Sequence, residues 1–159
     1  MNDTIHVREA TESDLDAMVR LNAEVQNLHA RAMPWPFKMA DLEAIKAAFA
    51  NWFADKQHTI AVACDDEQAV GYLMMRVREV PEHAFCFEQR LLYIDQIGVA
   101  RQYHRQGIGR KLIAFAQTIA RKKNIDRVEL DVWDFNKNAR GFFLSQGFQP
   151  TRHFMALTV

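Results

Sequence analysis

The stretch LLYIDQIGVARQYHRQGIGRKL, residues 91–112, places an apolar segment, a basic loop and two closely spaced glycines in direct succession. Residues 91–99 are apolar at nearly every position, which is typical of a strand that is buried on both faces of a sheet. Gly107 and Gly109 follow where a helix is expected to begin, although glycine weakens a helix. Something other than helix stability must therefore favour glycine at these two positions.

The charge of the chain is balanced overall but unevenly distributed. Residues 96–125 contain no Asp or Glu, and they carry seven basic residues: Arg101, Arg105, Arg110, Lys111, Arg121, Lys122 and Lys123. A helix N-terminus exposes unpaired N–H groups with a partial positive charge, and glycines let a phosphate approach the backbone. We therefore interpret residues 105–110 as a pyrophosphate cradle. The alternative is that the two glycines only permit close packing of the helix on the sheet.

Composition indicates a globular protein of one domain. The chain has 159 residues, of which 49% are hydrophobic and 25% charged, so it is long enough to bury a core. No apolar run reaches the length of a membrane span, and the polar N-terminus is unlike a signal peptide, so we expect a cytoplasmic protein without a membrane partner. Cys64 and Cys86 lack metal-ligand spacing; we expect both to be free and buried, and we expect no metal site.

Hydrophobic periodicity predicts a mixed α/β (α+β) chain. Thr11 and Asp14 resemble a capping box, and the helix that follows them is expected to stop before the MPWPF segment at residues 33–37. Further helices are expected at residues 39–53, 106–123 and 136–146. Strands are expected at residues 5–10, 58–64, 69–80, 90–99, 127–133 and 153–159.

Three families of phosphate-binding loops can be compared with the stretch around the glycines. A P-loop would require G-x-x-x-x-G-K-[ST], which is absent, and a dinucleotide loop would require glycine where Leu112 stands. The stretch strongly resembles the acyl-CoA motif [Q/R]-x-x-G-x-[G/A] of the GNAT family of N-acetyltransferases. Downstream, NKNARGFFLSQGF at residues 136–148 is similar to the second signature of that family, N-x-x-A-x-x-F-[Y/F]-x-x-x-G-F.

The resemblance extends over essentially the whole chain, because residues 5–21 also resemble the opening strand and helix of the family. It implies a single domain, residues 1–159, with the GNAT acyl-CoA N-acyltransferase fold: a mixed central sheet of about six to seven strands and about four helices. It also implies acetyl-CoA as cosubstrate. The residues to which the CoA-binding roles carry over are Ile97, Gly98, Val99, His104, Arg105, Gln106, Gly107, Ile108, Gly109, Arg110, Asn136 and Phe143.

Two positions depart from the family pattern. His104 stands where the first motif usually has Gln or Arg, which matters little if backbone amides hold the phosphates. Phe143 stands where many members have a Tyr that protonates the leaving thiolate, and a phenyl ring has no proton to donate. Tyr93 is a candidate donor, although an aromatic residue in a strand is more often part of the core.

The general base and the acceptor site are less defined by the sequence. Asp95 is a carboxylate within an apolar strand, where burial raises a pKa, so it is either the base or a structural ion-pair partner. Asn22, Gln26 and His29 share one face of the first helix and are candidates for acceptor binding. The alternative for these three residues is a solvated polar face beside a loop that Trp35 and Phe37 anchor.

The function that the resemblance implies is acetyl transfer from acetyl-CoA to a primary amine, by direct attack in a ternary complex. The acceptor is expected to be a small-molecule or peptide amine, and the protein a monomer or a homodimer. The alternative is a non-catalytic acyl-CoA-binding regulatory module, which the missing Tyr would permit. Nucleic-acid binding has only the basic segment in its favour, without an aromatic platform, and is not expected.

Overall fold

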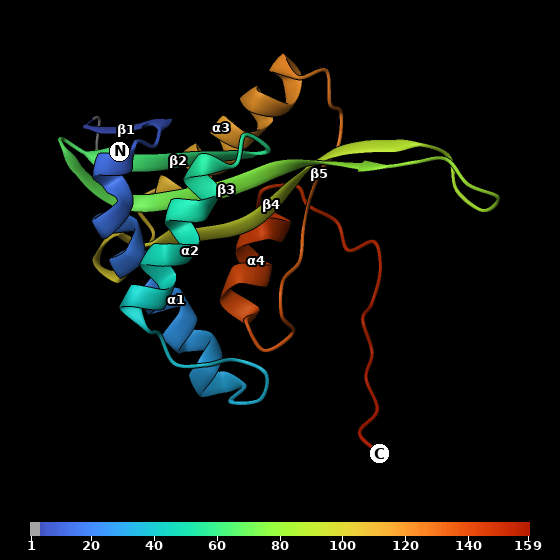
Figure 1. Cartoon of the computed structure of the whole chain (residues 1–159), viewed down its shortest axis with the longest axis horizontal. Coiled ribbons are helices and arrows are strands. Elements are labelled where there is room, and N and C mark those ends of the chain that lie inside the picture. The colour runs from blue at the N-terminus through green and yellow to red at the C-terminus, as the bar shows by residue number, and fades with distance from the viewer. Residues whose placement is uncertain (1–3) are drawn as a thin grey trace.

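The computed structural model describes residues 4–159, so residues 1–3 of the predicted domain lie outside it. In the described residues, five strands form one sheet in the order β1 (Ile5–Glu9), β2 (His58–Asp65), β3 (Gln68–Val80), β4 (Gln89–Val99) and β5 (Val128–Leu130). Neighbouring strands are antiparallel except β4 and β5, which are parallel (Figure 1). The helices are α1 (Leu15–Ala32), α2 (Leu42–Ala54), α3 (Ile108–Lys122) and α4 (Lys137–Ser145), with short 3-10 helices at Glu12–Asp14 and Arg101–Tyr103.

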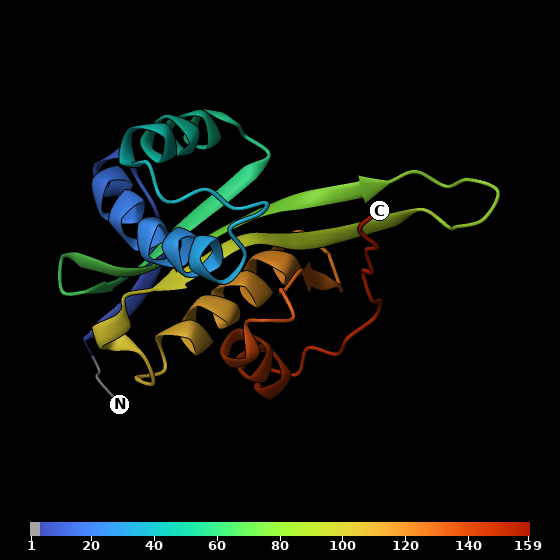
Figure 2. The same cartoon turned by 90° about the horizontal axis from the view of Figure 1, so that it is seen from below.

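Helices cover both faces of the sheet. Helices α1 and α2 lie on one side and α3 and α4 on the other (Figure 2). Side chains alternate between the two cores along the strands: Val62 and Tyr72 pack towards α1 and α2, whereas Ala63 and Leu73 pack towards α3. This double burial explains why the central strands are apolar at successive positions. None of the helices in the described chain is long and apolar enough to cross a membrane.

The four predicted α-helices are confirmed, with small shifts at their ends. Helix α1 ends at Ala32, directly before the MPWPF segment, as the two prolines predict. Helix α2 begins at Leu42 rather than near residue 39, because the Asp41 carboxylate accepts hydrogen bonds from the backbone N–H groups of Glu43 and Ala44.

The sheet has fewer strands than the six to seven that were expected. Residues 153–159 form no strand, and β5 has three residues where seven were predicted. A strand needs a neighbour for its backbone hydrogen bonds, and residues 153–159 extend away from the sheet without one (Figure 1).

The two cysteines are free, as expected, but only one of them is buried. Cys64 is buried, whereas Cys86 is exposed near the tip of the β3–β4 hairpin, contrary to the expectation that both are buried.

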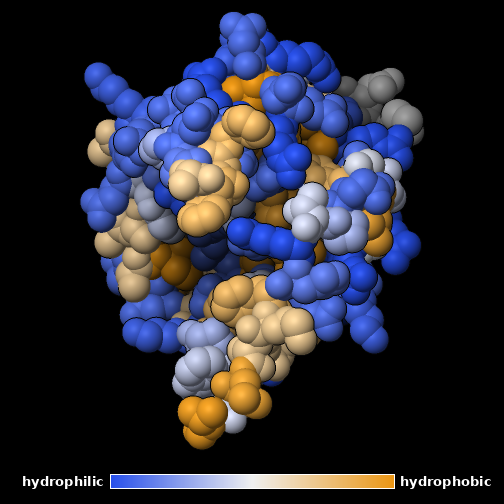
Figure 3. Space-filling model, turned by 90° about the vertical axis from the view of Figure 1, so that its right-hand side faces the viewer, coloured by the Kyte–Doolittle hydropathy of each residue, from blue (hydrophilic) through white to orange (hydrophobic). Residues whose placement is uncertain are grey.

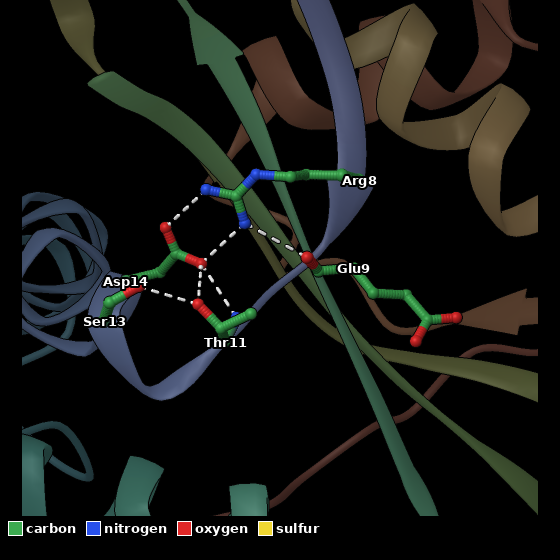
Figure 4. Close-up of polar contacts among 5 residues, drawn as sticks. All are labelled: Arg8, Glu9, Thr11, Ser13 and Asp14. Atoms are coloured by element: carbon green, nitrogen blue, oxygen red, sulfur yellow. Dashed lines mark hydrogen bonds and ion pairs between the residues drawn. The ribbon is translucent and has the colours of Figure 1, made fainter. Parts of the chain in front are cut away.

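A bidentate ion pair joins β1 to the start of α1 (Figure 4). The Arg8 guanidinium donates to both carboxylate oxygens of Asp14 at 2.7 and 2.9 Å, and the Thr11 N–H donates to Asp14 at 2.8 Å. The Asp14 side chain is buried, and the hydrogen bonds from Arg8 hold its pKa below the usual range despite that burial. Asp14 therefore fixes the turn that sends the chain from the sheet into the first helix.

We expect Asp14→Asn to lower the free energy of unfolding by about 1–3 kcal/mol at pH 7, because the variant loses charge-assisted hydrogen bonds. The folded-state pKa of Asp14 is depressed, so its contribution is present above its unfolded pKa of about 3.9 and disappears as the pH falls through the folded value. Urea unfolding of both proteins at several pH values measures this difference. The control is Asp16→Asn, which removes an exposed ion pair with Lys46 and is expected to change little. A loss that is independent of pH would contradict the assignment.

Candidate functional site

One edge of β4 is unpaired where the candidate site begins. The pairing of β4 with β5 ends at Ile94 and Leu130, whereas β4 continues to Val99. The register with β3 shifts between Met74 and Met75, which makes Asp95 the extra residue of a β-bulge. In the described residues, no strand occupies the β5 side of β4 from residue 95 to 99. Backbone groups on that edge are therefore available to an extended ligand.

The three strand residues expected to contact CoA lie on this unpaired part of β4. Ile97 and Val99 pack towards the core beneath α3, whereas Gly98 faces α1 and Tyr72. A Cβ atom at Gly98 would lie 2.6 Å from the Tyr72 ring, so glycine is needed here for close packing. Side chains thus fix the strand from both faces and leave its edge open.

The two glycines of the first motif are required for different structural reasons. Gly107 has a φ of 82° and begins α3, and a Cβ atom there would meet nothing within 4 Å. A Cβ atom at Gly109 would lie 2.8 Å from the Phe142 ring, so Gly109 permits α4 to pack on α3. Gly109 therefore does serve packing, but of α3 against α4 and not against the sheet as the alternative had it, whereas Gly107 is required by the left-handed turn into the helix.

The end of β4 is connected to the first turn of α3 by the 3-10 helix Arg101–Tyr103 and a short loop. The N–H groups of Ile108, Gly109 and Arg110 belong to that turn, where an α-helix has no internal acceptors for its N–H groups. Arg105 and Arg110 are exposed and form no ion pair within residues 4–159. Amide donors, the helix dipole and two arginines together favour an anion at this end of α3.

His104 and Gln106 make contacts within the loop. The Nε2 atom of His104 lies 2.9 Å from the Val99 carbonyl oxygen, which accepts a hydrogen bond from the ring. Gln106 donates from its amide to the Gln102 carbonyl oxygen at 3.1 Å. These contacts join the loop to the end of β4, so the side chain of His104 shapes the cradle.

The second motif lies on α4. Asn136 caps this helix, because its Oδ1 accepts a hydrogen bond from the Ala139 N–H at 3.1 Å. Phe143 is buried between Phe142 and Phe148, with ring centroids 5.2 and 5.7 Å away. The motif therefore places a buried aromatic group in the core on the α3 side of the sheet.

Asp95 is paired on one side only. Its Oδ1 atom lies 3.1 Å from the Arg76 guanidinium, while its Oδ2 atom and the Arg76 Nε are buried without a hydrogen-bond partner among the described residues. Burial raises the pKa of Asp95, and the positive charge of Arg76 opposes that rise. One carboxylate oxygen of Asp95 thus serves the ion pair with Arg76, and the other is unused among the described residues. Glu88, the carboxylate directly before β4, is exposed in the hairpin.

Tyr93 holds its proton firmly. Its hydroxyl donates to the Asp131 carboxylate at 2.5 Å, and Arg78 lies 4.6 Å above its ring. Burial and the Asp131 carboxylate raise the pKa of Tyr93 to about 12. A phenol in this state is a poor proton donor to a thiolate.

The polar groups expected at the acceptor site are bound within the protein. Asn22 is buried and donates to the Tyr72 hydroxyl at 2.9 Å and to the Gln96 amide oxygen at 2.8 Å. Gln26 donates to the Lys38 carbonyl oxygen at 2.6 Å, and the His29 Nδ1 lies 2.8 Å from the Val25 carbonyl oxygen. These contacts differ from the solvated face that the alternative described, because Asn22 is buried, and of the two expected anchors Trp35 is exposed while Phe37 packs against His29 and Trp133. The contacts instead fix α1 to β4 and hold the loop that follows α1.

Sequence reasoning missed a cluster of rings that we call the aromatic bridge, formed by His29, Phe37, Trp133 and Phe135. The His29 ring lies 5.1 Å from Phe37 and 5.3 Å from Phe135, and Phe37 lies 5.0 Å from Trp133. The bridge joins the loop after α1 to the loop after β5. The sequence signal was the pair Trp133 and Phe135, at and just after the end of the predicted strand, but spacing alone could not match it with residues about a hundred positions earlier.

Among the residues that the structure describes, no three His, Cys, Asp or Glu side chains are grouped so as to hold a metal ion. Of the residues expected to hold CoA, those from 97 to 110 lie at the end of β4, in the loop after it and in the first turn of α3. Asn136 caps α4 and Phe143 lies within it, and α4 packs on α3 where Phe142 meets Gly109. Asp95 and Tyr93 lie on the same strand, further towards β5.

Comparison with known proteins gives consistent matches. The pattern described as the Acetyltransferase (GNAT) family matches residues 22–148. An uncharacterized N-acetyltransferase in the pepI 3′ region of Lactobacillus delbrueckii subsp. lactis is 28% identical over 82 residues, which is 52% of this chain and 46% of that protein. The matched segment thus spans less than half of that relative.

Two solved structures illustrate the similarity of fold. A mutant of the BH1408 protein of Bacillus halodurans superposes with a TM-score of 0.92 at 24% identity, covering 97% of this chain and 99% of that one. The aminoglycoside N-acetyltransferase AAC(6′)-Iy in complex with CoA has a TM-score of 0.78 at 16% identity, with 98% and 94% covered. At these identities the likeness concerns the fold.

The glycine at position 107 can be tested against a glycine that has no such role. Gly107→Ala is expected to destabilise the protein by about 1–2 kcal/mol, because a Cβ atom is disfavoured in the left-handed conformation. Gly141→Ala, in the exposed face of α4 with open space around it, is expected to stabilise by about 0.5–1 kcal/mol. Urea unfolding of the two variants measures both effects. Equal effects of the same sign would refute a special conformation at Gly107.

Proposed function

This chain belongs to the acetyltransferase (GNAT) family, and from that premise we propose that it transfers an acetyl group from acetyl-CoA to a primary amine in a ternary complex. One observation carries the proposal: the open edge of β4 from residue 95 to 99 is followed, after one short 3-10 helix and a loop, by the left-handed turn at Gly107 and the first turn of α3. An extended pantetheine arm that ends in a pyrophosphate requires this combination of strand edge and anion site.

In our proposal, the backbone of Ile97, Gly98 and Val99 bonds the pantetheine arm as a neighbouring strand would. The amides from Gly107 to Arg110 hold the pyrophosphate, and Arg105 and Arg110 add positive charge. Gln106 and Ile108 complete the loop, and His104 positions it through the Val99 carbonyl. Asn136 and Phe143 flank the arm from α4. Bound acetyl-CoA supplies a thioester carbonyl that a neutral amine can attack.

Asp95 is the base in this proposal. An amine is protonated at neutral pH and must lose a proton to attack, and the partnerless Oδ2 of Asp95 accepts it. Arg76 holds the other carboxylate oxygen and keeps the group oriented. The amine nitrogen then bonds to the acetyl carbon while the carbon–sulfur bond breaks, and the nitrogen loses its second proton as the amide forms. Phe143 has no proton to give and Tyr93 keeps its own, so water relays that second proton from the nitrogen to the departing thiolate.

The acceptor that we propose is a small-molecule or peptide amine. AAC(6′)-Iy, which shares the fold, is described as an aminoglycoside N-acetyltransferase and was solved with a CoA–acetylneamine bisubstrate analogue. In this chain the acceptor would enter from the side of α1 and the aromatic bridge. Asn22, Gln26 and His29 would then act by fixing the wall of the acceptor site, because their side chains already have partners.

Turnover separates an enzyme from a regulatory acyl-CoA-binding module. We expect thiol release from acetyl-CoA with at least one amine from a panel of aminoglycosides, polyamines, amino acids and peptides. Asp95→Asn is expected to lower kcat about 10²-fold or more while acetyl-CoA affinity is retained. In the unaltered enzyme, kcat/KM should fall as the pH is lowered and Asp95 becomes protonated, and this fall should occur at a pH above the ordinary pKa of an Asp side chain. The Asp95→Asn variant should lack this fall.

The matched control for this experiment is Asp126→Asn, which changes an exposed carboxylate before the start of β5, at the opposite end of that strand from the open edge of β4, and should leave turnover unchanged. An Asp95→Asn protein that is unstable but normally active per folded molecule would show that Asp95 is only the ion-pair partner of Arg76. Binding of acetyl-CoA without turnover on any amine would favour the regulatory module.

The cradle is tested by reversing one charge at each end of α3. Arg110→Glu should weaken acetyl-CoA binding about ten-fold or more, because it places a carboxylate beside the pyrophosphate. It should not destabilise the fold, since an acidic residue in the first turn is favourable to a helix. Lys122→Glu makes the same change of net charge in the last turn and should leave binding intact. Calorimetric titration measures both, and equal losses of affinity would contradict the assigned site.

A further inference from the structure

Arg78 is a half-buried cation on β3 that has no anionic partner. Its guanidinium lies over the Tyr93 ring, 4.6 Å from the centre of that ring. In the part of the chain that the structure describes, Arg78 forms no ion pair. A cation–π contact uses the charge of a guanidinium but leaves its N–H groups free to donate to an oxygen. Arg78 therefore offers a charged, planar set of donors that no carboxylate of the described chain occupies.

Tyr93 and Asp131 fix the ring on which this guanidinium rests. The Tyr93 hydroxyl donates to the Asp131 carboxylate at 2.5 Å, and Arg152 lies 3.7 Å from the same carboxylate. Asp131 is thus engaged by two other groups. The ring is held at one end by its own strand and at the other by the chain that follows β5, so the position of the Arg78 side chain is defined before a ligand binds.

Arg78 lies on the same face of the sheet as the candidate base, one step along the strand. Val77 packs towards the core beneath α3, so Arg76 and Arg78 point to the opposite face. On that face Arg76 contacts Asp95, and Arg78 contacts Tyr93. Residues two apart along a strand are separated by about 7 Å, which is therefore the distance expected between groups bound at Arg78 and at Asp95. Burial raises the pKa of Asp95, and the charges of Arg76 and Arg78 oppose that rise, so Arg78 acts electrostatically on the candidate base.

The part of β3 that carries Arg78 is accessible from solvent. Pairing between β2 and β3 ends at His58 and Arg76, and the β3–β4 hairpin projects beyond the helices (Figure 1). Figure 3 views the molecule from the hairpin side and shows hydrophilic side chains between separate apolar groups. A small polar ligand therefore reaches this face without displacing a helix.

The other charges near this position are already balanced. Arg76 lies 3.1 Å from Asp95, and Glu129 on the neighbouring strand β5 lies 2.6 Å from Arg127. Among these groups, Arg78 is the cation that lacks a counter-ion. A ligand with one negative charge would supply the missing counter-ion, whereas a polyamine would place further positive charge beside Arg76 and Arg78.

On the premise of the acetyl transfer proposed above, we propose that the acceptor is an amine that carries a carboxylate, and that Arg78 binds this carboxylate while the amine lies at Asp95. A guanidinium and a carboxylate match in shape and form two parallel N–H···O bonds. The separation of about 7 Å fits an ω-amino acid such as 6-aminohexanoate, whose extended chain spans about this length. Arg78 is thus a specificity-determining residue, and it narrows the acceptor from amines in general to amino acids with separated amine and carboxylate groups.

The first test compares an acid with its uncharged amide. For the unaltered protein, kcat/KM for 6-aminohexanoate is expected to exceed that for 6-aminohexanamide by about ten-fold or more, which is the contribution of a hydrogen-bonded ion pair. Arg78→Gln should remove this preference, mainly by raising KM for the acid, and should leave the values for the amide unchanged. Equal turnover of the two compounds by the unaltered protein would overturn the proposal, and so would an equal loss on both compounds in Arg78→Gln.

The matched control is Arg121→Gln, which removes an exposed arginine in the last turn of α3, on the opposite face of the sheet. It should leave the preference for the acid intact.

Binding measures the same preference without turnover. In calorimetric titrations of the CoA-saturated protein, 6-aminohexanoate should bind about ten-fold or more tightly than its amide, and Arg78→Gln should abolish the difference. If no amine is acetylated, the proposed transferase activity fails. The titration then decides the role of Arg78 by itself, and a protein that does not prefer the acid refutes that role.

Discussion

The separation of β4 from β5 after Ile94 is the constraint on which the candidate site depends. Up to that point the two strands share backbone hydrogen bonds, and beyond it β4 continues alone to Val99. The bulge at Asp95 lies at the point of separation and changes which side chains face each core. If β4 and β5 remained paired as far as Val99, β4 would have no free edge for an extended ligand. The anion site at the start of α3 would then have no ligand arm leading to it.

The packing around this edge keeps it rigid without occupying it. Tyr72 packs against Gly98 and completes a buried triangle of hydrogen bonds with Asn22 and Gln96, so α1, β3 and β4 form one unit. On the opposite face, Phe142 packs on Gly109 and Phe143 lies in the core. Residues that look like ligand contacts in the sequence thus serve to hold backbone groups, and the backbone is what an extended arm and a pyrophosphate recognise.

Some polar groups near the site have hydrogen-bond partners within the protein, and others do not. Tyr93 is bonded to Asp131 and has its pKa raised to about 12, whereas Asp95 keeps one buried oxygen without a partner. A buried, partnerless carboxylate oxygen is costly to the fold, and such costs are commonly found where a group has a chemical task. This contrast is the physical basis for giving the base role to Asp95 and withholding the acid role from Tyr93.

The sequence by itself determined the four helices, the central strands and the joining of β4 to α3, because periodicity, prolines and caps act over a few residues. It also determined the family, through two motifs. Tertiary structure decided that Gly109 serves packing while Gly107 serves the turn, that Asn22, Gln26 and His29 already have partners, and that an aromatic bridge joins distant loops. It also left residues 153–159 without a sheet neighbour. These outcomes depend on which distant groups meet, and a strand exists only where another strand completes its hydrogen bonds.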